Sequence, residues 1–377
     1  MRLLSWVGLW TCVVTFGLLG CAAAVSEQAT DATPTSKPVV LPRAERVAAE
    51  QTVIAFGSCL KTDQPAPIFD HLLAMQPDVL LMLGDNVYVS RARGEKTPEV
   101  FDLKYGELAA QPYWPRLRQD VPLLLATWDD HDYGKNDAGK EWEKKDNGKD
   151  AFLEFFPTSA TKIPEGRDGV YHAVTVGPEG RRVQFIMLDT RWSRDAIDRK
   201  PGPRGARGPY LPSDDTTRTL LGEAQWAWLA DVLSEPADVR LIGSSIQVVA
   251  REHGWECWGN FPHELARLYR LIDETHANGV VLLSGDRHLG EISKDVDDVT
   301  PYPMWDITAS GFNQDTRDVD EPNRYRLGGV HRNSHFGAIQ IDWAGNDPQL
   351  RLMLIGEDGQ PFESQTVTLS SLQAAAE

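Results

Sequence analysis

Five short apolar runs constrain the fold of this chain more than any other feature of its sequence. Small residues and then polar residues follow each run at once, and longer amphipathic stretches separate the runs. Runs of this length and composition are typical of buried strands, and their alternation with helical stretches predicts mixed α and β structure. The five runs cover residues 52–56, 78–83, 121–126, 239–242 and 279–283.

Further elements follow from the spacing of apolar residues and from turn signals. We expect helices over residues 66–75, 98–109, 223–233 and 262–277. We expect a strand pair at residues 170–176 and 182–188, and a final antiparallel set at 304–308, 336–343, 349–355 and 365–369. Together they predict an α/β (α+β) fold in which two sheets pack face to face beneath outer helices. Residues 194–215, with several Gly, Pro and Arg, are expected to form an active-site loop or lid.

Polar residues that can bind metals or transfer protons stand just after the five apolar runs. Ligands of α/β sheets gather beyond the carboxyl ends of the strands, so these side chains are expected to meet at one rim. A single strand end of this kind would mean little, whereas five together predict a site. The residues are Cys59, Asp85, Tyr88, Asp129, Asp130, His131, Gln247, Asp286 and His288.

The segment from Gly84 to Tyr88 has the most specific pattern. A carboxylate directly after a strand can bridge two metal ions, and Tyr88 returns to the same side of the turn three residues after Asp85. Because only a strongly Lewis-acidic ion deprotonates a phenol, a tyrosine ligand would indicate ferric iron rather than zinc or magnesium. The alternative is a Tyr88 that merely packs against the end of the sheet.

Two other clusters extend this pattern. The segment from Trp128 to Asp132 places three carboxylates around one histidine, and like charges at this spacing raise each other's pKa unless cations are bound. The alternative is a solvated acidic loop, but the preceding apolar run and Trp128 argue against it. Asp286 and His288 stand two residues apart, so they face the same side of an extended segment.

The first twenty residues have the order of a secretory signal. One positive charge at Arg2 precedes an apolar run over residues 3–19, and small residues lead to Cys21. A membrane-spanning helix is the alternative, but the run is short for one. The string LLGC resembles a bacterial lipobox, which implies a lipid on Cys21 and an exported, membrane-anchored lipoprotein of the periplasm or cell surface. We therefore expect a signal peptide over residues 1–20, a flexible tether over 21–50 and the folded domain over 51–372.

Composition narrows the partners and the cysteine chemistry. The formal net charge of −17 disfavours general nucleic-acid binding, because an acidic surface repels the phosphate backbone. An acidic enzyme that acts on phosphate esters needs local positive charge, and bound metal ions are its simplest source. Cys59 and Cys257 remain in an exported mature chain, where a disulfide is permitted. They form a disulfide or two buried thiols, unless Cys59 is a metal ligand.

Six strings, in this order, resemble the alkaline phosphatase D (PhoD-like) group of calcineurin-like metallophosphoesterases. They are FGSC, LGDNVY, TWDDHD, LDTRW, WGNFPHE and SGDRH, and the resemblance runs from about Val53 to Trp343. It implies a four-layer α-β-β-α sandwich of two mixed sheets. It also implies metal-dependent hydrolysis of phosphate monoesters or diesters, with a small phosphate ester as substrate and no protein partner.

The resemblance also implies a role for each residue at the strand ends. Cys59, Tyr88 and His288 would bind ferric iron, and Asp85 would bridge it to a second ion. That second ion would be calcium, held by Asp130, Gln247 and Asp286, and Asp129 would bind a further calcium or orient His131. The catalytic pair would be Asp130 and His131, with His131 touching the substrate. Two positions depart from related phosphoesterases, which carry Asn at position 130 and often His at position 247.

The types of donor atom agree with this division. A thiolate, a phenolate and an imidazole suit iron, whereas the remaining donors are all oxygens, as calcium and magnesium prefer. Arg191, Arg287 and Asn260 could contact phosphate or line the pocket, but structural pairing is an equal alternative for the two arginines.

Other functions remain open. The same metals would serve a phosphodiesterase or phospholipase-type enzyme, so the ligands do not separate monoesters from diesters. A surface lipoprotein that binds calcium without turnover would use scattered acidic loops, and a periplasmic binding protein for phosphate esters is a third alternative. Neither would need a Cys, a Tyr and a His to converge.

Overall fold

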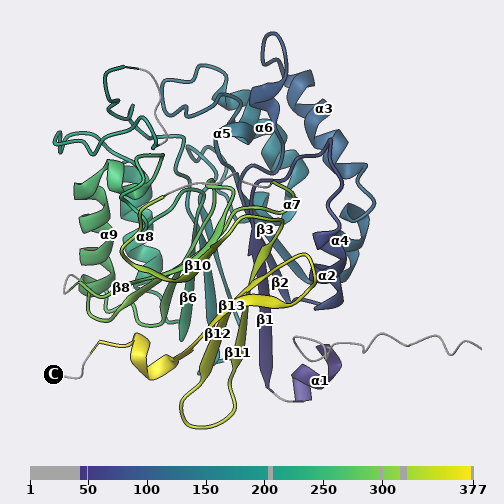
Figure 1. The fold of residues 1–377 in the computed structure, drawn as a ribbon, viewed down its shortest axis with the longest axis vertical. Coiled ribbons are helices and arrows are strands. Elements are labelled where there is room, and N and C mark those ends of the chain that lie inside the picture. Colours follow the sequence, from purple (N-terminus) through teal and green to yellow (C-terminus); the bar gives the residue numbers. More distant parts are fainter. Residues whose placement is uncertain (1–42, 49, 203–206, 298–299, 315–320, 375–377) are drawn as a thin grey trace, which may run out of the picture. The chain divides into compact units, whose positions relative to one another are not determined.

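Two mixed β-sheets pack face to face, and helices cover their outer faces (Figure 1). This computed structural model describes residues 43–48, 50–202, 207–297, 300–314 and 321–374, all within one unit that begins at residue 38. The predicted signal peptide, Cys21 and most of the predicted tether lie outside the described residues. Among the helices that are described, none has the length and apolar character needed to cross a membrane.

The first sheet has six strands in the order β13-β12-β11-β1-β2-β3. Strands β1, β2 and β3 are parallel to one another. Strand β11 pairs with β1 in antiparallel fashion, and β12 and β13 continue the antiparallel pairing from β11. The strands are β1 (Gln51–Gly57), β2 (Val79–Leu83), β3 (Leu123–Thr127), β11 (Phe336–Asp342), β12 (Gln349–Ile355) and β13 (Pro361–Thr368).

The second sheet has seven strands in the order β10-β8-β9-β7-β6-β5-β4. The central strands β5, β6, β7 and β9 are parallel, and antiparallel strands flank them. The strands are β4 (His172–Val176), β5 (Val183–Met187), β6 (Val239–Ser244), β7 (Val280–Ser284), β8 (Gly290–Asp295), β9 (Met304–Ala309) and β10 (Arg326–His331).

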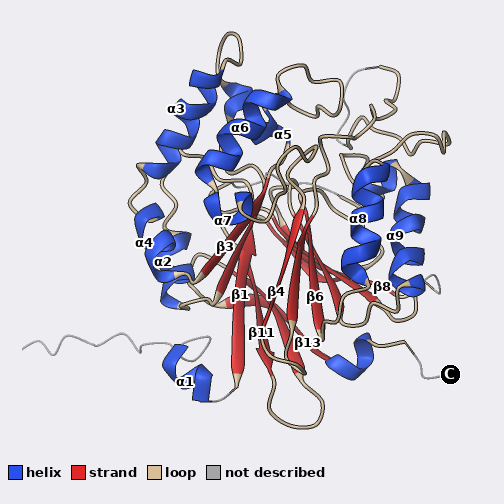
Figure 2. Ribbon diagram, turned by 180° about the vertical axis from the view of Figure 1, so that it is seen from behind, coloured by secondary structure: helices blue, strands red, loops and turns tan. Residues whose placement is uncertain are grey.

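The helices form two groups on opposite sides of the sheets (Figures 1 and 2). Helices α2, α3, α4, α6 and α7 lie on the side of the first sheet, and α8 and α9 lie on the side of the second. The helices are α1 (Arg43–Ala48), α2 (Ile68–Ala74), α3 (Pro98–Ala109), α4 (Trp114–Asp120), α5 (Asp130–Tyr133), α6 (Lys145–Phe155), α7 (Pro157–Ala160), α8 (Glu223–Leu233) and α9 (Pro262–Glu274), with short 3₁₀ turns η1 (Val89–Arg91), η2 (Trp258–Asn260) and η3 (Leu369–Leu372).

Alternate side chains of β1 show where the core lies. Ile54 and Phe56 pack in one apolar cluster with Ile242 of the second sheet, whereas Val53 and Ala55 belong to a second cluster with the helices of the first sheet. Both faces of the strand are therefore buried, which explains the continuous apolar run in its sequence. The expected sandwich of two mixed sheets is confirmed.

Most expected elements form, but four points about the elements need correction. The strand expected at 304–308 is not part of the final antiparallel set, because β9 pairs in parallel with β7 in the second sheet. Strands β8 and β10 were not predicted, since β8 carries charged side chains and β10 contains two glycines and is an edge strand. Helices α4, α5, α6 and α7 were also not predicted.

The fourth correction concerns the tether. The expected tether reaches residue 50, yet residues 43–48 form α1. Arg46 of that helix is buried and donates hydrogen bonds to the carbonyl of Met75 (3.0 Å) and to Asp78. The folded part therefore begins earlier than residue 51.

Candidate metal centre

The loops that follow β1, β2, β3, β6 and β7 meet at one end of the two sheets (Figure 2). Backbone hydrogen bonds join them directly: the amide of Cys59 donates to the carbonyl of Gly84 (3.3 Å), and that of Leu60 to the carbonyl of Asp85 (2.9 Å). The amide of His131 donates to Oδ1 of Asp85 (3.3 Å). The strand ends therefore form the common rim that the sequence predicts.

Asp85 stands at the centre of the first group of candidate ligands. Its Oδ2 accepts a hydrogen bond of 3.0 Å from the phenol of Tyr88 and one of 3.5 Å from the thiol of Cys59. Donor atoms of Cys59, Asp85 and His288 all lie within 4.8 Å of one another. The structure thus brings together the thiol, the phenol, the carboxylate and the imidazole that the sequence assigns to iron.

A second group adjoins the first and consists mainly of carboxylates. Donor atoms of Asp129, Asp130 and Asp286 lie within 4.8 Å of one another, and so do those of Asp85, Asp130 and His131. Asp85 therefore belongs to both groups, as a bridging carboxylate would. Each group could therefore hold a cation, and Asp85 is shared between the two groups.

Gln247 is connected to this region less directly. Its Nε2 donates to Glu291 (2.8 Å) and to Thr308 (2.9 Å), so the amide group is fixed in orientation. Its Oε1 is buried without a hydrogen-bond partner. Among the described residues, no hydrogen bond joins Gln247 to another predicted ligand, but its oxygen remains available to a cation.

Unpaired buried oxygens show that the donor set fits cations. Oδ2 of Asp129 and Oδ1 of Asp130 are buried and accept no hydrogen bond. Burying an anionic oxygen in this state is costly unless a cation compensates it. Burial, reinforced by the neighbouring carboxylates, also raises the pKa of Asp85 well above its usual range. The residues present therefore fit positively charged ions at both groups.

The neutral donors agree with this conclusion. Burial and the charge of Asp85 raise the pKa of the Cys59 thiol and of the Tyr88 phenol, so both keep their protons unless a strong Lewis acid is bound. Burial and the charge of Arg287 lower the pKa of His288 to about 3, which leaves its imidazole neutral and able to bind a metal. Burial raises the pKa of Asp286 to about 7.

The backbone is strained at the same positions. Cys59, Asp85, Asp286 and His288 have φ angles of 63°, 53°, 68° and 55°, in the left-handed region that residues other than glycine rarely adopt. Strain of this kind costs about 1 kcal/mol or more per residue and is typical of functional sites. Gly84, with φ of 100°, cannot be replaced easily, because a Cβ there would lie 2.6 Å from the Cβ of Asp129.

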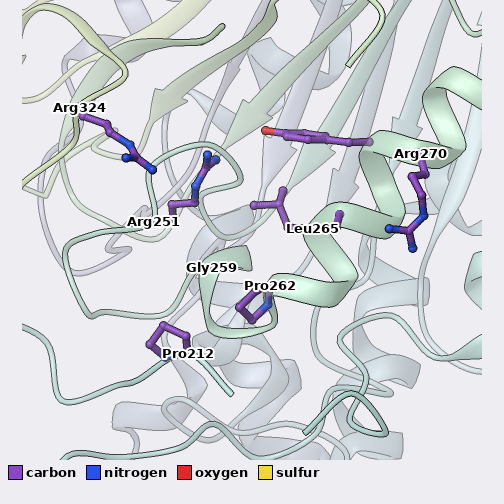
Figure 3. A pocket seen from close by; sticks show the side chains of 9 residues that line it. Pro212, Arg251, Gly259, Pro262, Leu265, Arg270 and Arg324 are labelled. Atoms are coloured by element: carbon purple, nitrogen blue, oxygen red, sulfur yellow. The ribbon is translucent and has the colours of Figure 1, made fainter. Parts of the chain in front are cut away.

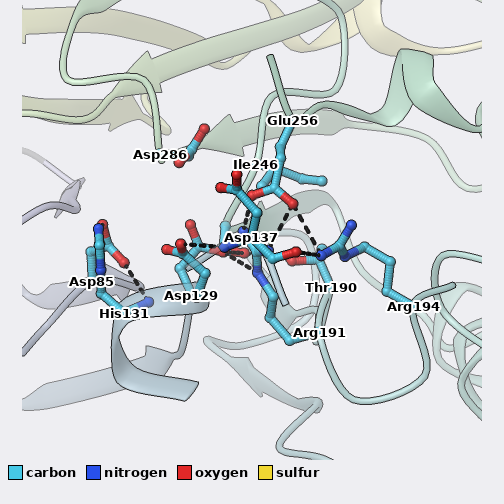
Figure 4. A network of polar contacts seen from close by, with 12 residues as sticks. Asp85, Asp129, His131, Asp137, Thr190, Arg191, Arg194, Ile246, Glu256 and Asp286 are labelled. Carbon is cyan, nitrogen blue, oxygen red and sulfur yellow. Dashed lines mark hydrogen bonds and ion pairs between the residues drawn. The ribbon is translucent and has the colours of Figure 1, made fainter. Parts of the chain in front are cut away.

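A buried ion-pair network holds Asp129 (Figure 4). Oδ1 of Asp129 accepts hydrogen bonds from Nε of Arg191 and from Ser245, both 2.7 Å long. The guanidinium of Arg191 also forms two 3.0 Å hydrogen bonds with the carboxylate of Glu256, which Arg194 contacts as well. Of the two alternatives for Arg191, structural pairing therefore agrees with the geometry.

Arg287 and Asn260 are engaged in a similar way. Arg287 pairs with Glu321 and lies 3.5 Å from Asp286. Oδ1 of Asn260 accepts a hydrogen bond of 2.8 Å from the amide of Cys257, which shapes the turn η2. Cys257 and Cys59 are both free and buried, so of the alternatives for this pair the two buried thiols are observed and the disulfide is not. The expected loop after residue 194 reaches the site through Tyr210, whose hydroxyl bonds Asp137.

Several residues at the rim were not predicted from the sequence. Oγ of Ser310 accepts a hydrogen bond of 2.8 Å from the amide of His288 and lies 3.1 Å from the thiol of Cys59. Ser310 directly follows β9, so the same strand-end signal could have found it. Ser90 contacts Nδ1 of His131, and nothing in its local sequence indicates that contact.

Asp132, which the sequence grouped with its acidic neighbours, has a structural role. Its carboxylate accepts hydrogen bonds from the amides of Asn86 (2.8 Å), Val87 (3.1 Å) and Asp129 (2.9 Å). These bonds fix the loop after β2 against the loop after β3, so Asp132 positions both groups of candidate ligands.

A separate cavity of about 490 Å³ lies beside α9 (Figure 3). Leu265, Tyr269 and Arg270 of α9 line it together with Arg251 and Arg324. None of the predicted site residues contributes to it, so it is distinct from the rim.

The chain is similar in sequence to one described family. The family model for PhoD-like phosphatase matches residues 54–346. Alkaline phosphatase D of Bacillus subtilis (strain 168) is 27% identical over 294 residues, which cover 68% of this chain and 48% of that protein. The chain therefore spans about half the length of this curated relative.

Solved structures show the same fold. A structure of PhoD is similar with a TM-score of 0.66 at 18% identity, covering 86% of this chain and 72% of the other. The purple acid phosphatase PPD1 of yellow lupin gives 0.55 at 12% identity, covering 84% and 54%. GAP50, described as the anchor in the inner membrane complex of Plasmodium, gives 0.52 at 13% identity, covering 87% and 90%.

Proposed function

The chain belongs to the PhoD-like phosphatase family, and on this premise we propose that it is a metal-dependent enzyme that hydrolyses phosphate esters. One observation supports this most: Cys59, Tyr88 and His288, from three different strand ends, converge on Asp85. A binding protein or a structural calcium site has no need of this combination of donors.

The donor atoms suggest which ions the two groups hold. We propose ferric iron for Cys59, Tyr88, His288 and Asp85, because a thiolate, a phenolate and an imidazole suit that ion. For the second group we propose calcium, bound by Asp85, Asp130, Asp286 and the oxygen of Gln247, since all these donors are oxygens. Asp129 already uses one oxygen for Arg191 and Ser245, so only its Oδ2 remains for a cation.

The ions, when bound, supply positive charge that polarises the phosphoryl group and makes water a stronger nucleophile. We propose that His131 assists the departure of the leaving group. Its Nδ1 is paired with Ser90, which leaves Nε2 as the ring nitrogen that can face the substrate. Nε2 lies 4.0 Å from Oδ2 of Asp85. In this role, Nε2 of His131 stabilises negative charge on the leaving oxygen of the substrate or donates a proton to that oxygen. Asp130 adjoins this ring, with Oδ2 held by the amide of Asp137 (2.8 Å).

Two alternative functions agree with part of the same observations. A phosphodiesterase or phospholipase-type enzyme would use the same residues, so the substrate must decide between them. A calcium-binding surface lipoprotein without turnover is the second. A shared fold does not by itself establish catalysis, so the site must be tested directly.

The decisive experiment compares two chromogenic esters. Metal-replete protein is assayed with p-nitrophenyl phosphate and with bis-p-nitrophenyl phosphate, with and without a chelator. We expect hydrolysis that the chelator abolishes and that added iron and calcium restore. Failure to hydrolyse either ester would favour the non-catalytic alternative, and hydrolysis of the diester alone would identify a phosphodiesterase.

We also propose that the protein is exported and attached to a membrane through lipid on Cys21. The proposal depends on the order of charge, apolar run and small residues before that cysteine. Expression of the full chain with labelled palmitate tests it. Label is expected in the full chain and not in a Cys21→Ser variant, and equal labelling of both would refute the lipid site.

A further inference from the structure

The loop after β2 brings an exposed guanidinium to the rim. Arg91 ends the turn η1, and its Cζ lies 4.5 Å from the centre of the Tyr88 ring. That ring packs in turn against His131, with 4.2 Å between ring centres. Arg91 is thus held one ring away from the residue proposed to face the leaving group, while its own side chain remains exposed.

Arg91 differs from the other arginines of the site in its pairing. Arg191 is bound to Asp129 and Glu256, and Arg287 to Glu321, so the charge of each is already compensated. For Arg91, by contrast, no carboxylate partner occurs among the described residues, and its guanidinium lies over the Tyr88 ring. A cation–π contact orients a guanidinium without neutralising it.

The candidate ligands at the rim are mostly carboxylates, in a chain whose net charge is −17. Beside them, Arg91 is a cation that no carboxylate among the described residues compensates, held against the Tyr88 ring.

We propose that Arg91 binds the terminal oxygens of the substrate's phosphoryl group and makes the site selective for monoesters over diesters. This inference rests on the proposed function and specifies its substrate class. A phosphate monoester carries up to two negative charges and three terminal oxygens, whereas a diester carries one charge and two such oxygens. An extra guanidinium therefore strengthens the binding of a monoester more than that of a diester.

The test uses Arg91→Ala and Arg91→Lys with Arg93→Ala as the matched control. Arg93 is also exposed and lies two residues further along the same loop, and it contacts none of the described residues of the site. Values of kcat and KM are measured for p-nitrophenyl phosphate and for its bis-ester with metal-replete protein. The affinity for inorganic phosphate is measured by calorimetry, which does not depend on turnover.

For Arg91→Ala we expect kcat/KM on the monoester to fall about ten-fold, mainly through KM, as the loss of one charge-assisted hydrogen bond predicts. On the diester the loss should be less than about three-fold, and phosphate affinity should weaken about as much as monoester binding. Arg91→Lys should retain part of the kcat/KM on the monoester and part of the phosphate affinity, and Arg93→Ala should match the wild type in both.

Equal losses on both esters, or kinetics indistinguishable from Arg93→Ala, would overturn the inference. A wild-type protein that cleaves neither ester would instead refute the proposed function. In that case the affinity for inorganic phosphate still tests the role of Arg91. If Arg91→Ala bound phosphate as tightly as the wild type, this inference would be overturned as well.

Discussion

Tyr88 donates a 3.0 Å hydrogen bond to Oδ2 of Asp85, three residues before it in the chain. The same oxygen accepts a hydrogen bond of 3.5 Å from the thiol of Cys59, so two weakly acidic groups donate to one carboxylate. Burial raises the pKa of both groups, and each therefore stays protonated until a cation replaces its proton. This relationship leads to the first two predictions.

Replacing Tyr88 with Phe should remove the proposed phenolate ligand while keeping the aromatic ring. The packing against His131 and the contact with Arg91 depend on the ring and should persist. We expect the iron-loaded variant to lose the visible absorption of an iron phenolate and to bind iron more weakly, as absorption spectra and metal analysis would show. Tyr105→Phe is the control, because that buried phenol has no hydrogen-bond partner. Identical spectra of Tyr88→Phe and the wild type would exclude a phenolate ligand.

Replacing Cys59 with Ala should cause the loss of both bound iron and hydrolytic activity. Loss of residues that only support metal ligands typically costs 10–100-fold in affinity or activity, so loss of a ligand should cost about 100-fold or more. Iron content by mass spectrometry and hydrolysis of p-nitrophenyl phosphate are the measurements. Cys257→Ala is the control, since that thiol is equally buried and free. If Cys59→Ala kept its iron and full activity, the thiol would be merely structural.

Replacing Arg191 with Met should destabilise the fold strongly. The buried guanidinium compensates Asp129 and Glu256, and removing one partner of a buried ion pair costs about 3–5 kcal/mol. Urea unfolding of the metal-free protein measures the effect. Arg116→Met removes an exposed pair with Asp70 and should cost less than about 1 kcal/mol. Similar losses in the two variants would contradict a compensating role for Arg191.

The buried side chain of His172, which is not one of the rim residues, should make the free energy of unfolding depend on pH. Burial lowers the pKa of its imidazole to about 4, below the value near 6.5 of an unfolded chain. Protonation therefore favours the unfolded state. The stability from keeping this ring neutral is complete above about pH 6.5 and is lost as the pH falls toward 4, by roughly 3 kcal/mol in all.

A His172→Gln variant tests this dependence, with His276→Asn at an exposed position as the control. Urea unfolding at pH 7.5 and pH 5, with chelator present so that metal release plays no part, gives the free energies of unfolding. Between these pH values His172→Gln should lose about 2 kcal/mol less than the wild type, and the control should follow the wild type. Equal losses in all three proteins would show that His172 is not the group responsible.

Local sequence determined the candidate ligands and the strands that carry them. Residues such as Asp85 and His288 directly follow apolar runs, and a short buried strand with its polar end is encoded within about ten neighbouring residues. Strands with charged or glycine-rich sequences, such as β8 and β10, escaped prediction because their pairing partners, and not their own periodicity, make them strands.

The tertiary structure alone decided which of these side chains meet. Glu256 pairs with Arg191 across 65 positions of the chain, and Ser310 contacts Cys59 across 251. The same holds for β9, whose parallel pairing with β7 depends on the order of strands in the sheet. Such contacts depend on how distant strands pack together, and the apolar pattern of each strand is compatible with several arrangements. The sequence by itself therefore determined which chemical groups are available at the rim. The packing of the sheets determined which of these candidate ligands lie close together and which charges neutralise one another.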